Sequence, residues 1–365
     1  MMQIPRNGLR SLLLAALLCC AAAPSAHAEA DHGAIARGAL SEVVRPGYAE
    51  LARSAAALDG KVDALCEAPS AAGLDAAKEA FVATVMSWSR VEIFRFGPVI
   101  KDHRYARLFY WPDPKGIGLR QVQRVLAEKN KTATAPATLA KKSVALQGLP
   151  ALEYLLYGPG AETLSKTGDD NFRCRFAAAI TANMANIAEE VEKAWGVDAA
   201  FTKDFLEPGQ NDPLYRAPKD VTLELFKAFT SGIELVRDQK LGKPLGVSAE
   251  RAKRRLAALW RSGLSFQNMV GNLEGVRRLF IKGGFARIVT QESPGVENSI
   301  LFDLNHSIEV LRDIDAPISD AVRDEELRAK LEALRVALKS ARTTAASMIE
   351  RGAGLSFGFN AMDGD

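Results

Sequence analysis

The sequence predicts an all-α protein made of two tandem up-and-down four-helix-bundle-like domains packed side by side. Nearly every long segment places apolar residues at helical spacing, and none shows the sustained alternation of a strand. Each half also contains a helix with an arginine-and-polar cluster, over 88–95 and 260–277, followed by a helix with acidic residues. Two bundles in tandem would explain this weak repetition. Amphipathic helices of similar composition are the alternative explanation.

The first 28 residues have the pattern of a secretory signal. Two arginines precede an apolar run over 12–23, and small residues lead up to Ala28. The run is shorter than the roughly 20 residues that span a bilayer. Lipid attachment at Cys19 or Cys20 is an alternative, but neither cysteine follows a small residue. We therefore expect cleavage after Ala28 and a soluble periplasmic protein without a further transmembrane segment.

Charge and length limit the possible partners and the architecture. The signal holds two of the 47 basic residues and none of the 44 acidic ones, so 45 basic residues remain and the formal charge becomes +1. A nearly neutral chain argues against nucleic acid as a partner. The remaining length suits two domains or one large domain.

Only two cysteines, Cys66 and Cys174, follow the signal. In an oxidising compartment such a pair usually forms a disulfide. Closing a loop of this length would stabilise the fold by at most about 4.7 kcal/mol in the chain-entropy model. A metal site with two thiolates is the alternative, although no histidine lies near either cysteine in the sequence.

Four helices are expected in the first domain, which we place over residues 29–160. The second helix ends at a Gly-Pro stop signal, and the aromatic, basic segment over 100–114 reads as an ordered loop. The fourth helix is broken at Gly148 and restarts at Pro150, because the first helical position tolerates a residue without an N–H. The four expected helices cover residues 34–65, 74–96, 118–129 and 138–157.

The second domain is expected over residues 161–365, after a polar, glycine-bearing connector. A stretch with three prolines over 207–218 is predicted to be irregular. The last helix repeats leucine and alanine at the spacing of a packed bundle seam. The expected helices cover residues 172–195, 221–238, 249–280 with an interruption at Gly263, 297–314 and 325–350.

A single carboxylate, Glu153, lies in the first turn after the break at Pro150. An acid near a helix N-terminus complements the helix dipole, which is worth roughly 0.3–1 kcal/mol. A structural role of this kind is the alternative to a functional one.

This segment resembles the signature of the imelysin-like family, bacterial envelope proteins first described through an insulin-cleaving activity and later tied mostly to iron acquisition. The signature is Gly-x-His-x-x-Glu followed by an aromatic residue and leucines. Gly148, Glu153 and Tyr154 match it, whereas Pro150 stands in place of the histidine. Further segments look like a proline-bearing subgroup of the family, and the resemblance implies the same two-bundle fold. These segments are residues 88–98, 109–114 and 357–365.

Glu92 lies on or beside the apolar stripe of its helix, so its charge needs a partner. Arg95 follows three residues later, and Arg90 lies on a neighbouring face. A buried ion pair between helices is one interpretation. The family resemblance implies the other, a binding site, because the corresponding polar helices converge with the helix of Glu153 in a cleft. The predicted ligand-binding residues are Glu153, Glu92, Arg90, Arg95 and Tyr154.

Iron is the expected cofactor or cargo. Carboxylate and phenolate oxygens suit ferric iron better than soft metals. His306 and Glu309 also form an H-x-x-E pair like those of carboxylate di-iron proteins, although an exposed helix face explains the pair equally well. The predicted metal ligands are Glu153, Glu92, His306 and Asp303.

The resemblance implies a non-enzymatic periplasmic protein that binds iron, or an iron-containing ligand, in an interdomain cleft and contributes to iron acquisition. A metal-dependent peptidase and a protein that docks an envelope partner are the alternatives. A hydrolytic zinc site needs about three protein ligands and a general base. The chain has no H-E-x-x-H motif, and Pro150 offers no ligand atom. The sequence therefore argues against peptidase activity.

Overall fold

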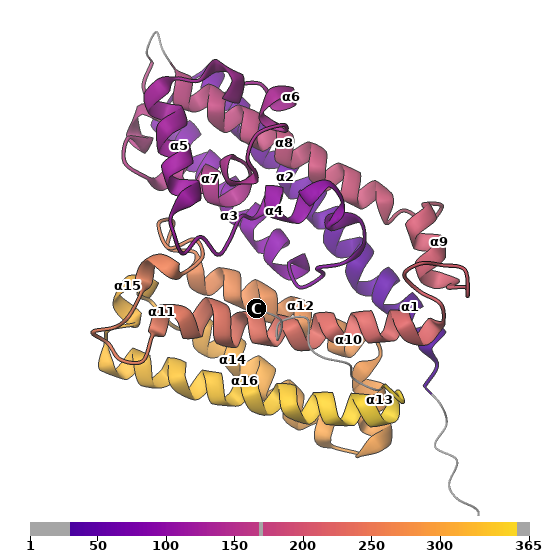
Figure 1. Cartoon of the computed structure of the whole chain (residues 1–365). Coiled ribbons are helices and arrows are strands. Elements are labelled where there is room, and N and C mark those ends of the chain that lie inside the picture. Colours follow the sequence, from indigo (N-terminus) through magenta and orange to yellow (C-terminus); the bar gives the residue numbers. More distant parts are fainter. Residues whose placement is uncertain (1–29, 168–170, 356–365) are drawn as a thin grey trace, which may run out of the picture.

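The computed structural model describes residues 30–167 and 171–355. The expected signal over 1–28 and the family-like tail over 357–365 lie outside these residues. The described chain is helical and contains no strand, which confirms the all-α class (Figure 1). None of its helices is long and apolar enough to cross a membrane.

The first group of helices occupies the upper part of Figure 1. It opens with one continuous helix, in which a π-helical stretch joins two α-helical parts, and α3 packs along its second part. Of the shorter helices, α4, α6 and α7 pack on α8, and α5 packs on α7. The bounds are α1 (His32–Ala39), η1 (Leu40–Val44), α2 (Arg45–Glu67), α3 (Ala71–Val91), η2 (Gly97–Val99), η3 (Lys101–His103), α4 (Arg104–Leu108), α5 (Ile117–Glu128), η4 (Lys131–Ala133), α6 (Pro136–Leu139), η5 (Val144–Leu146), α7 (Gly148–Tyr157), η6 (Ala161–Ser165), α8 (Phe172–Ala194) and α9 (Ala200–Leu206).

The second group lies below the first in Figure 1. Its long helices α12, α14 and α16 pack successively on one another, and α10 packs on α12. The bounds are α10 (Pro218–Glu234), η7 (Leu235–Gly242), α11 (Lys243–Leu245), η8 (Arg254–Leu256), α12 (Ser265–Lys282), α13 (Phe285–Glu292), α14 (Val296–Arg312), α15 (Ile318–Ala321) and α16 (Glu325–Gly352).

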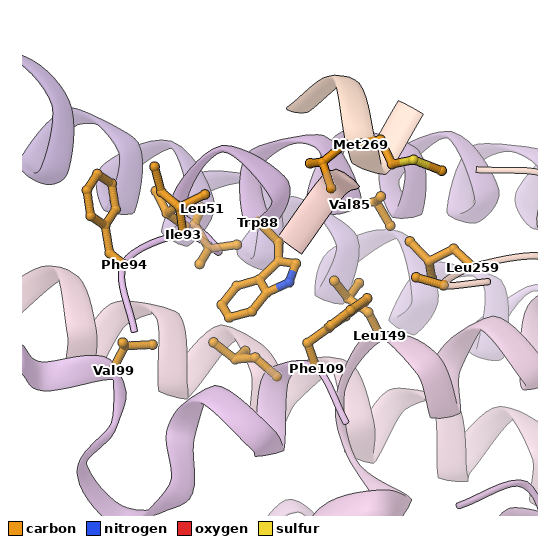
Figure 2. Close-up of a cluster of buried hydrophobic side chains, with 14 of the residues drawn as sticks. Leu51, Val85, Trp88, Ile93, Phe94, Val99, Phe109, Leu149, Leu259 and Met269 are labelled. Carbon is orange, nitrogen blue, oxygen red and sulfur yellow. The ribbon is translucent and has the colours of Figure 1, made fainter. Parts of the chain in front are cut away.

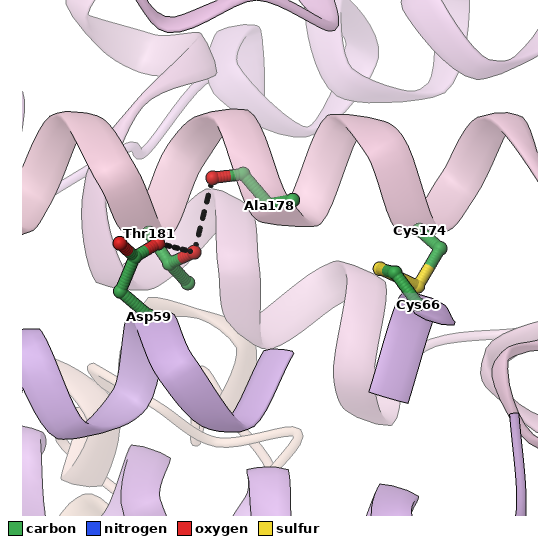
Figure 3. The surroundings of a disulfide bond; sticks show 5 residues. All are labelled: Asp59, Cys66, Cys174, Ala178 and Thr181. Atoms are coloured by element: carbon green, nitrogen blue, oxygen red, sulfur yellow. Dashed lines mark hydrogen bonds between the residues drawn. A yellow bond between two sulfur atoms is a disulfide. The ribbon is translucent and has the colours of Figure 1, made fainter. Parts of the chain in front are cut away.

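Helix α8 belongs with the first group, although the sequence placed it beyond the expected boundary at residue 160. It packs along α2 and against α7. The disulfide between Cys66 and Cys174 joins the end of α2 to the start of α8 across a Cα–Cα distance of 5.6 Å (Figure 3). Thr181 donates a hydrogen bond of 2.7 Å to Asp59 further along the same pair of helices. The described part of the polar connector thus lies between helices of the same group.

The two groups meet where α3 crosses α12. A Cβ atom on Gly271 would lie 2.5 Å from Cβ of Ser89, and one on Gly275 would lie 2.2 Å from the carbonyl oxygen of Arg90. Both positions of α12 therefore require glycine. One hydrophobic core continues across this contact, and Figure 2 shows Trp88 of α3 in the same cluster as Met269 of α12.

Four expected helices differ from the structure. The helix expected over 74–96 runs from Ala71 to Val91 and ends before the Gly-Pro step. Residues 249–264 form irregular loops and η8, although their buried apolar residues imitate a helical pattern. The helix expected over 138–157 is divided into α6, η5 and α7. Its break falls at Gly148, where φ is +74° and a Cβ would lie 2.2 Å from the carbonyl oxygen of Leu108. The helix expected to end at residue 238 continues as the π-helical segment η7.

Loss of the disulfide should destabilise the protein. The Cys66→Ser, Cys174→Ser double variant is expected to lose about 2–4 kcal/mol of unfolding free energy, because the unfolded chain regains the freedom of a long loop. Urea unfolding with and without reductant measures the change. Reductant should destabilise the wild type and leave the double variant unaffected. Equal sensitivity of both proteins would contradict this prediction.

Candidate functional site: a cavity between the two groups of helices

A cavity of about 320 Å³ opens between the two groups of helices. Its walls come from the aromatic loop after α4, from α5, from α7 and from the irregular segment before α12, which we call the 255–261 loop. The side chains that matter below are Tyr110, Trp111, Glu153, Tyr154, Trp260 and Arg261. The aromatic segment predicted to be an ordered loop therefore forms one side of the cavity.

Glu153 joins α7 to the 255–261 loop. It is 3% exposed, and its Oε1 accepts hydrogen bonds of 2.9 Å from the backbone N–H groups of Arg261 and Ser262 and from the Ser262 hydroxyl. Oε2 has no hydrogen-bond partner among residues 30–167 and 171–355, so it is the oxygen available to a ligand. Burial raises the pKa of this carboxyl, although the three donors and the Arg261 charge oppose the rise.

Two aromatic side chains fix the walls. The indole N–H of Trp111 donates to the carbonyl oxygen of Leu256 at 3.1 Å, which holds the aromatic loop against the second group. Tyr154 lies on α7 beside Glu153, and its hydroxyl accepts a 3.2 Å hydrogen bond from the Gln123 amide. Both rings line the cavity. The wall is consequently apolar, with hydroxyl and indole groups at defined places.

Arg261 provides a cation in the cavity wall. Its guanidinium carbon lies 4.3 Å from the centroid of the Trp260 ring and 5.5 Å from that of Tyr154. Such distances are typical of cation–π contacts. Burial lowers the pKa of Arg261, whereas the nearby Glu153 charge raises it. Within the described chain, no carboxylate forms an ion pair with this guanidinium.

Glu92 lies behind the aromatic wall. It is fully buried, and its Oε2 accepts from Nζ of Lys240 at 2.5 Å. Lys240 Nζ also donates to the amide oxygens of Asn268 at 2.6 Å and Asn272 at 2.7 Å. Both amide groups in turn donate to Glu92 Oε2. We call these four residues the polar seam; Glu92 is engaged in it and does not line the cavity.

Lys240 connects the polar seam to the cavity wall. Its Nζ lies 5.4 Å from the centroid of Phe109 and 5.6 Å from that of Trp111, and both rings line the cavity. Burial lowers the pKa of Lys240 to about 8, while the Glu92 charge opposes the shift. The residue lies in η7, and π-helical insertions occur frequently at functional sites.

Arg90 and Arg95 point away from Glu153. Arg90 donates to Glu50 at 2.7 Å and to Glu274 at 2.8 Å, beside a second cavity of about 520 Å³. Arg95 is exposed, and its guanidinium lies 5.0 Å from the ring centroid of Tyr105. Neither arginine lines the cavity that contains Glu153.

The four predicted metal ligands occupy three separate places. Glu153 lines the cavity and Glu92 lies in the polar seam, whereas His306 and Asp303 belong to α14. His306 is exposed and stacks on Phe302 with ring centroids 5.9 Å apart. No three His, Cys, Asp or Glu side chains in the described ranges come together in a way that could hold a metal ion. The structure therefore does not assemble the predicted ligand set.

Comparison with known proteins decides the family. The family model of imelysin, classed as peptidase M75, matches residues 44–345. The chain belongs to the imelysin family. The resemblance seen in its sequence motifs is thereby confirmed.

Three relatives illustrate the match. Iron-regulated protein A of Synechococcus elongatus is 25% identical over 210 residues, which cover 57% of this imelysin and 54% of that protein. The chain thus spans about half the length of this relative. Solved structures of an imelysin-like protein from Psychrobacter arcticum and of a protein assigned as an iron-regulated protein A precursor from Parabacteroides distasonis share its fold. Each has a TM-score of 0.73. The first is 19% identical and the match covers 90% of this chain and 97% of that one. The second is 14% identical and the match covers 88% of this chain and 94% of that one.

This chain differs from the imelysin signature in one side chain, since Pro150 stands at the position of the histidine. Gly148 allows α7 to begin against the carbonyl oxygen of Leu108, and Glu153 lines the cavity. Pro150 also lines the cavity and brings no donor atom to the position of the histidine. Sequence reasoning missed Arg261, because it expected residues 249–280 to be helical. It missed Lys240 as well, although the two asparagines four residues apart on α12 could have indicated a buried polar partner.

Removing the lysine of the polar seam should strongly destabilise the fold. Lys240→Met leaves the Glu92 carboxylate buried without its cation, which is expected to cost about 3–5 kcal/mol of unfolding free energy. The Glu92→Gln, Lys240→Met double variant removes both charges and should recover much of that loss. Chemical denaturation of both variants measures the difference. A double variant as unstable as the single one would show that charge burial is not the cause.

The same lysine should make stability depend on pH. The pKa of Lys240 is about 8 in the folded protein and near 10.5 when unfolded, so the unfolded chain binds more protons between these values. Its contribution should therefore rise as the pH increases from 8 to 10.5 and stay constant below 8. Buried tyrosines have the opposite effect on stability at high pH. The unfolding free energy of the Glu92→Gln, Lys240→Met double variant, which keeps these tyrosines, should therefore be subtracted from that of the wild type. A difference that does not change with pH would contradict the prediction.

Proposed function

We propose that this imelysin binds a small iron-containing ligand in the cavity beside Glu153 and contributes to iron acquisition without catalysing a reaction. Hard oxygen donors in the cavity wall carry this proposal: Glu153 Oε2 and the phenol groups of Tyr110 and Tyr154. Relatives named as iron-regulated proteins support the connection with iron.

The donor set fits iron that arrives with its own chelator better than a bare ion. Glu153 contributes one available carboxylate oxygen. Asp113 also lines the cavity, but its two oxygens accept from the backbone N–H groups of Ile117 and Gly118 at 2.8 Å each. One carboxylate oxygen and two phenol groups leave most positions around an iron ion to be filled. A chelator would fill them.

The donor set also favours binding over hydrolysis. A zinc peptidase holds its metal with about three protein ligands and keeps one position for water. In this cavity the signature histidine is replaced by Pro150, and Glu153 Oε1 is held by three donors of the 255–261 loop. These features support a binding protein, although the family was classed with peptidases.

We place this function in the periplasm. The signal pattern up to Ala28 supports export, and the bond between Cys66 and Cys174 suits an oxidising compartment. An exported protein meets iron complexes before they cross the inner membrane, which suits a role in uptake.

Glu153→Gln tests the proposal. Glutamine keeps an oxygen for the three hydrogen bonds and replaces Oε2 by an amide N–H₂ group, so the fold should persist. We expect iron-complex affinity to fall at least about tenfold, which corresponds to about 1.4 kcal/mol. Calorimetric titration with ferric ions and ferric chelates measures it. Ferrous and zinc ions serve as comparison.

Glu309→Gln is the matched control for this experiment. Glu309 is exposed on α14 and belongs to the predicted H-x-x-E pair, so its replacement should leave affinity unchanged. Unchanged affinity of Glu153→Gln would remove Glu153 from the binding site. No binding of any iron species to the wild type would refute the proposed function.

A further inference from the structure

Arg261 is a half-buried cation without an ion-pair partner among the described residues. The guanidinium lies near the rings of Trp260 and Tyr154, and the Glu153 carboxylate accepts a hydrogen bond from the backbone of Arg261. Arginine is almost never fully buried without a partner, and this guanidinium is half-buried without one among the described residues. The edge of the guanidinium fork therefore remains free for an anion in the cavity.

A second arginine adds positive charge near the guanidinium of Arg261. Arg255 also lines the cavity, and its charge adds to the lowering of the pKa of Arg261. Lys115 lies at the same cavity and is exposed. Neither Arg255 nor Lys115 forms an ion pair within the described chain. Three cations thus surround a cavity that has only two acids, Glu153 and Asp113, among its described lining residues, and an anionic ligand would reduce the repulsion between the cations.

The size and the donors of the cavity limit the anion further. A volume of about 320 Å³ lies at the small end of ligand pockets, which commonly span roughly 300–1,000 Å³. Arginine binds carboxylates through two parallel hydrogen bonds. Carboxylate oxygens are also hard donors that hold ferric iron. One ligand class satisfies Arg261 and supplies the coordination that the protein lacks.

We propose that Arg261 selects a negatively charged, small carboxylate chelate of iron, binding one of its carboxylates with the guanidinium fork while Arg255 and Lys115 attract it. The identity of the metal in this statement rests on the proposed function. The preference for an anion rests on the three cations alone. The two parts can therefore fail separately.

The test compares three probes on protein purified from a host that exports it. Ferric citrate is an anionic iron carboxylate, citrate alone lacks the metal, and ferrioxamine B is a ferric complex with positive charge. We expect ferric citrate to bind most tightly and ferrioxamine B not to bind. Raising the salt concentration should weaken ferric citrate binding, because exposed charges are screened.

Variants assign the effect to Arg261. Arg261→Gln should weaken ferric citrate binding at least about tenfold, and Arg261→Lys should recover part of the loss because it keeps the charge without the fork. Arg255→Gln should produce a smaller loss. Arg323→Gln, an exposed arginine at the end of α15, is the matched control and should bind as the wild type does. Thermal unfolding verifies that each variant is folded.

The outcomes separate the two proposals. Equal binding of ferrioxamine B and ferric citrate, unaffected by Arg261→Gln, would overturn the anion preference and leave iron binding intact. Citrate that binds as tightly without iron, and depends on Arg261, would confirm the anion site and overturn the role of iron. Failure of both citrate probes to bind the wild type would overturn the carboxylate inference.

Discussion

The buried ion pair between Glu92 and Lys240 is the contact on which the junction of the two groups of helices depends. It brings together the end of α3, the π-helical segment η7 and, through two asparagines, α12. Burying these charges is expensive, and a well-packed apolar pair would often be as stable. The pair instead fixes the relative position of the three segments, because Lys240 can donate to all three of its acceptors in only one alignment.

The shape of the cavity depends on this alignment of the three segments. Lys240 lies under Phe109 and Trp111, so the polar seam supports the aromatic wall from behind. On the opposite side, Glu153 holds the 255–261 loop through three hydrogen bonds. The two carboxylates thus have different roles. Glu92 forms the ion pair at the junction, while Glu153 holds the 255–261 loop and lines the cavity. The polar seam and Glu153 together determine where Arg261 can meet a ligand.

Helical periodicity predicted most of the fold because the long helices bury one continuous stripe each. The last helix is an example, since its predicted seam residues from Leu331 to Ala345 are buried. The pairing of Cys66 with Cys174 was also predictable, because the compartment left few alternatives. These features depend on local spacing or on residue type, and both are visible in a single sequence.

The candidate site was only partly predictable because its parts come from distant segments. Glu153 could be identified from its signature, but Arg261 and Lys240 acquire their roles only through tertiary contacts. The apolar residues of the 255–261 loop are buried without being helical, so their pattern was misleading. The H-x-x-E pair of His306 and Glu309 suggested a metal site because its spacing places two ligand types on one helix face. That face is exposed in the structure.

The glycine contacts between α12 and α3 have a consequence for how fast a ligand can exchange. Backbones that touch at Gly271 and Gly275 cannot separate slightly without breaking contacts along both helices. A hinge motion of one group against the other would also expose the charges of Glu92 and Lys240. Lys115 and Arg255 lie outside these two helices, on segments that line the cavity. Entry and release should therefore follow loop motions of nanoseconds to microseconds instead of the slower domain motions of microseconds to milliseconds.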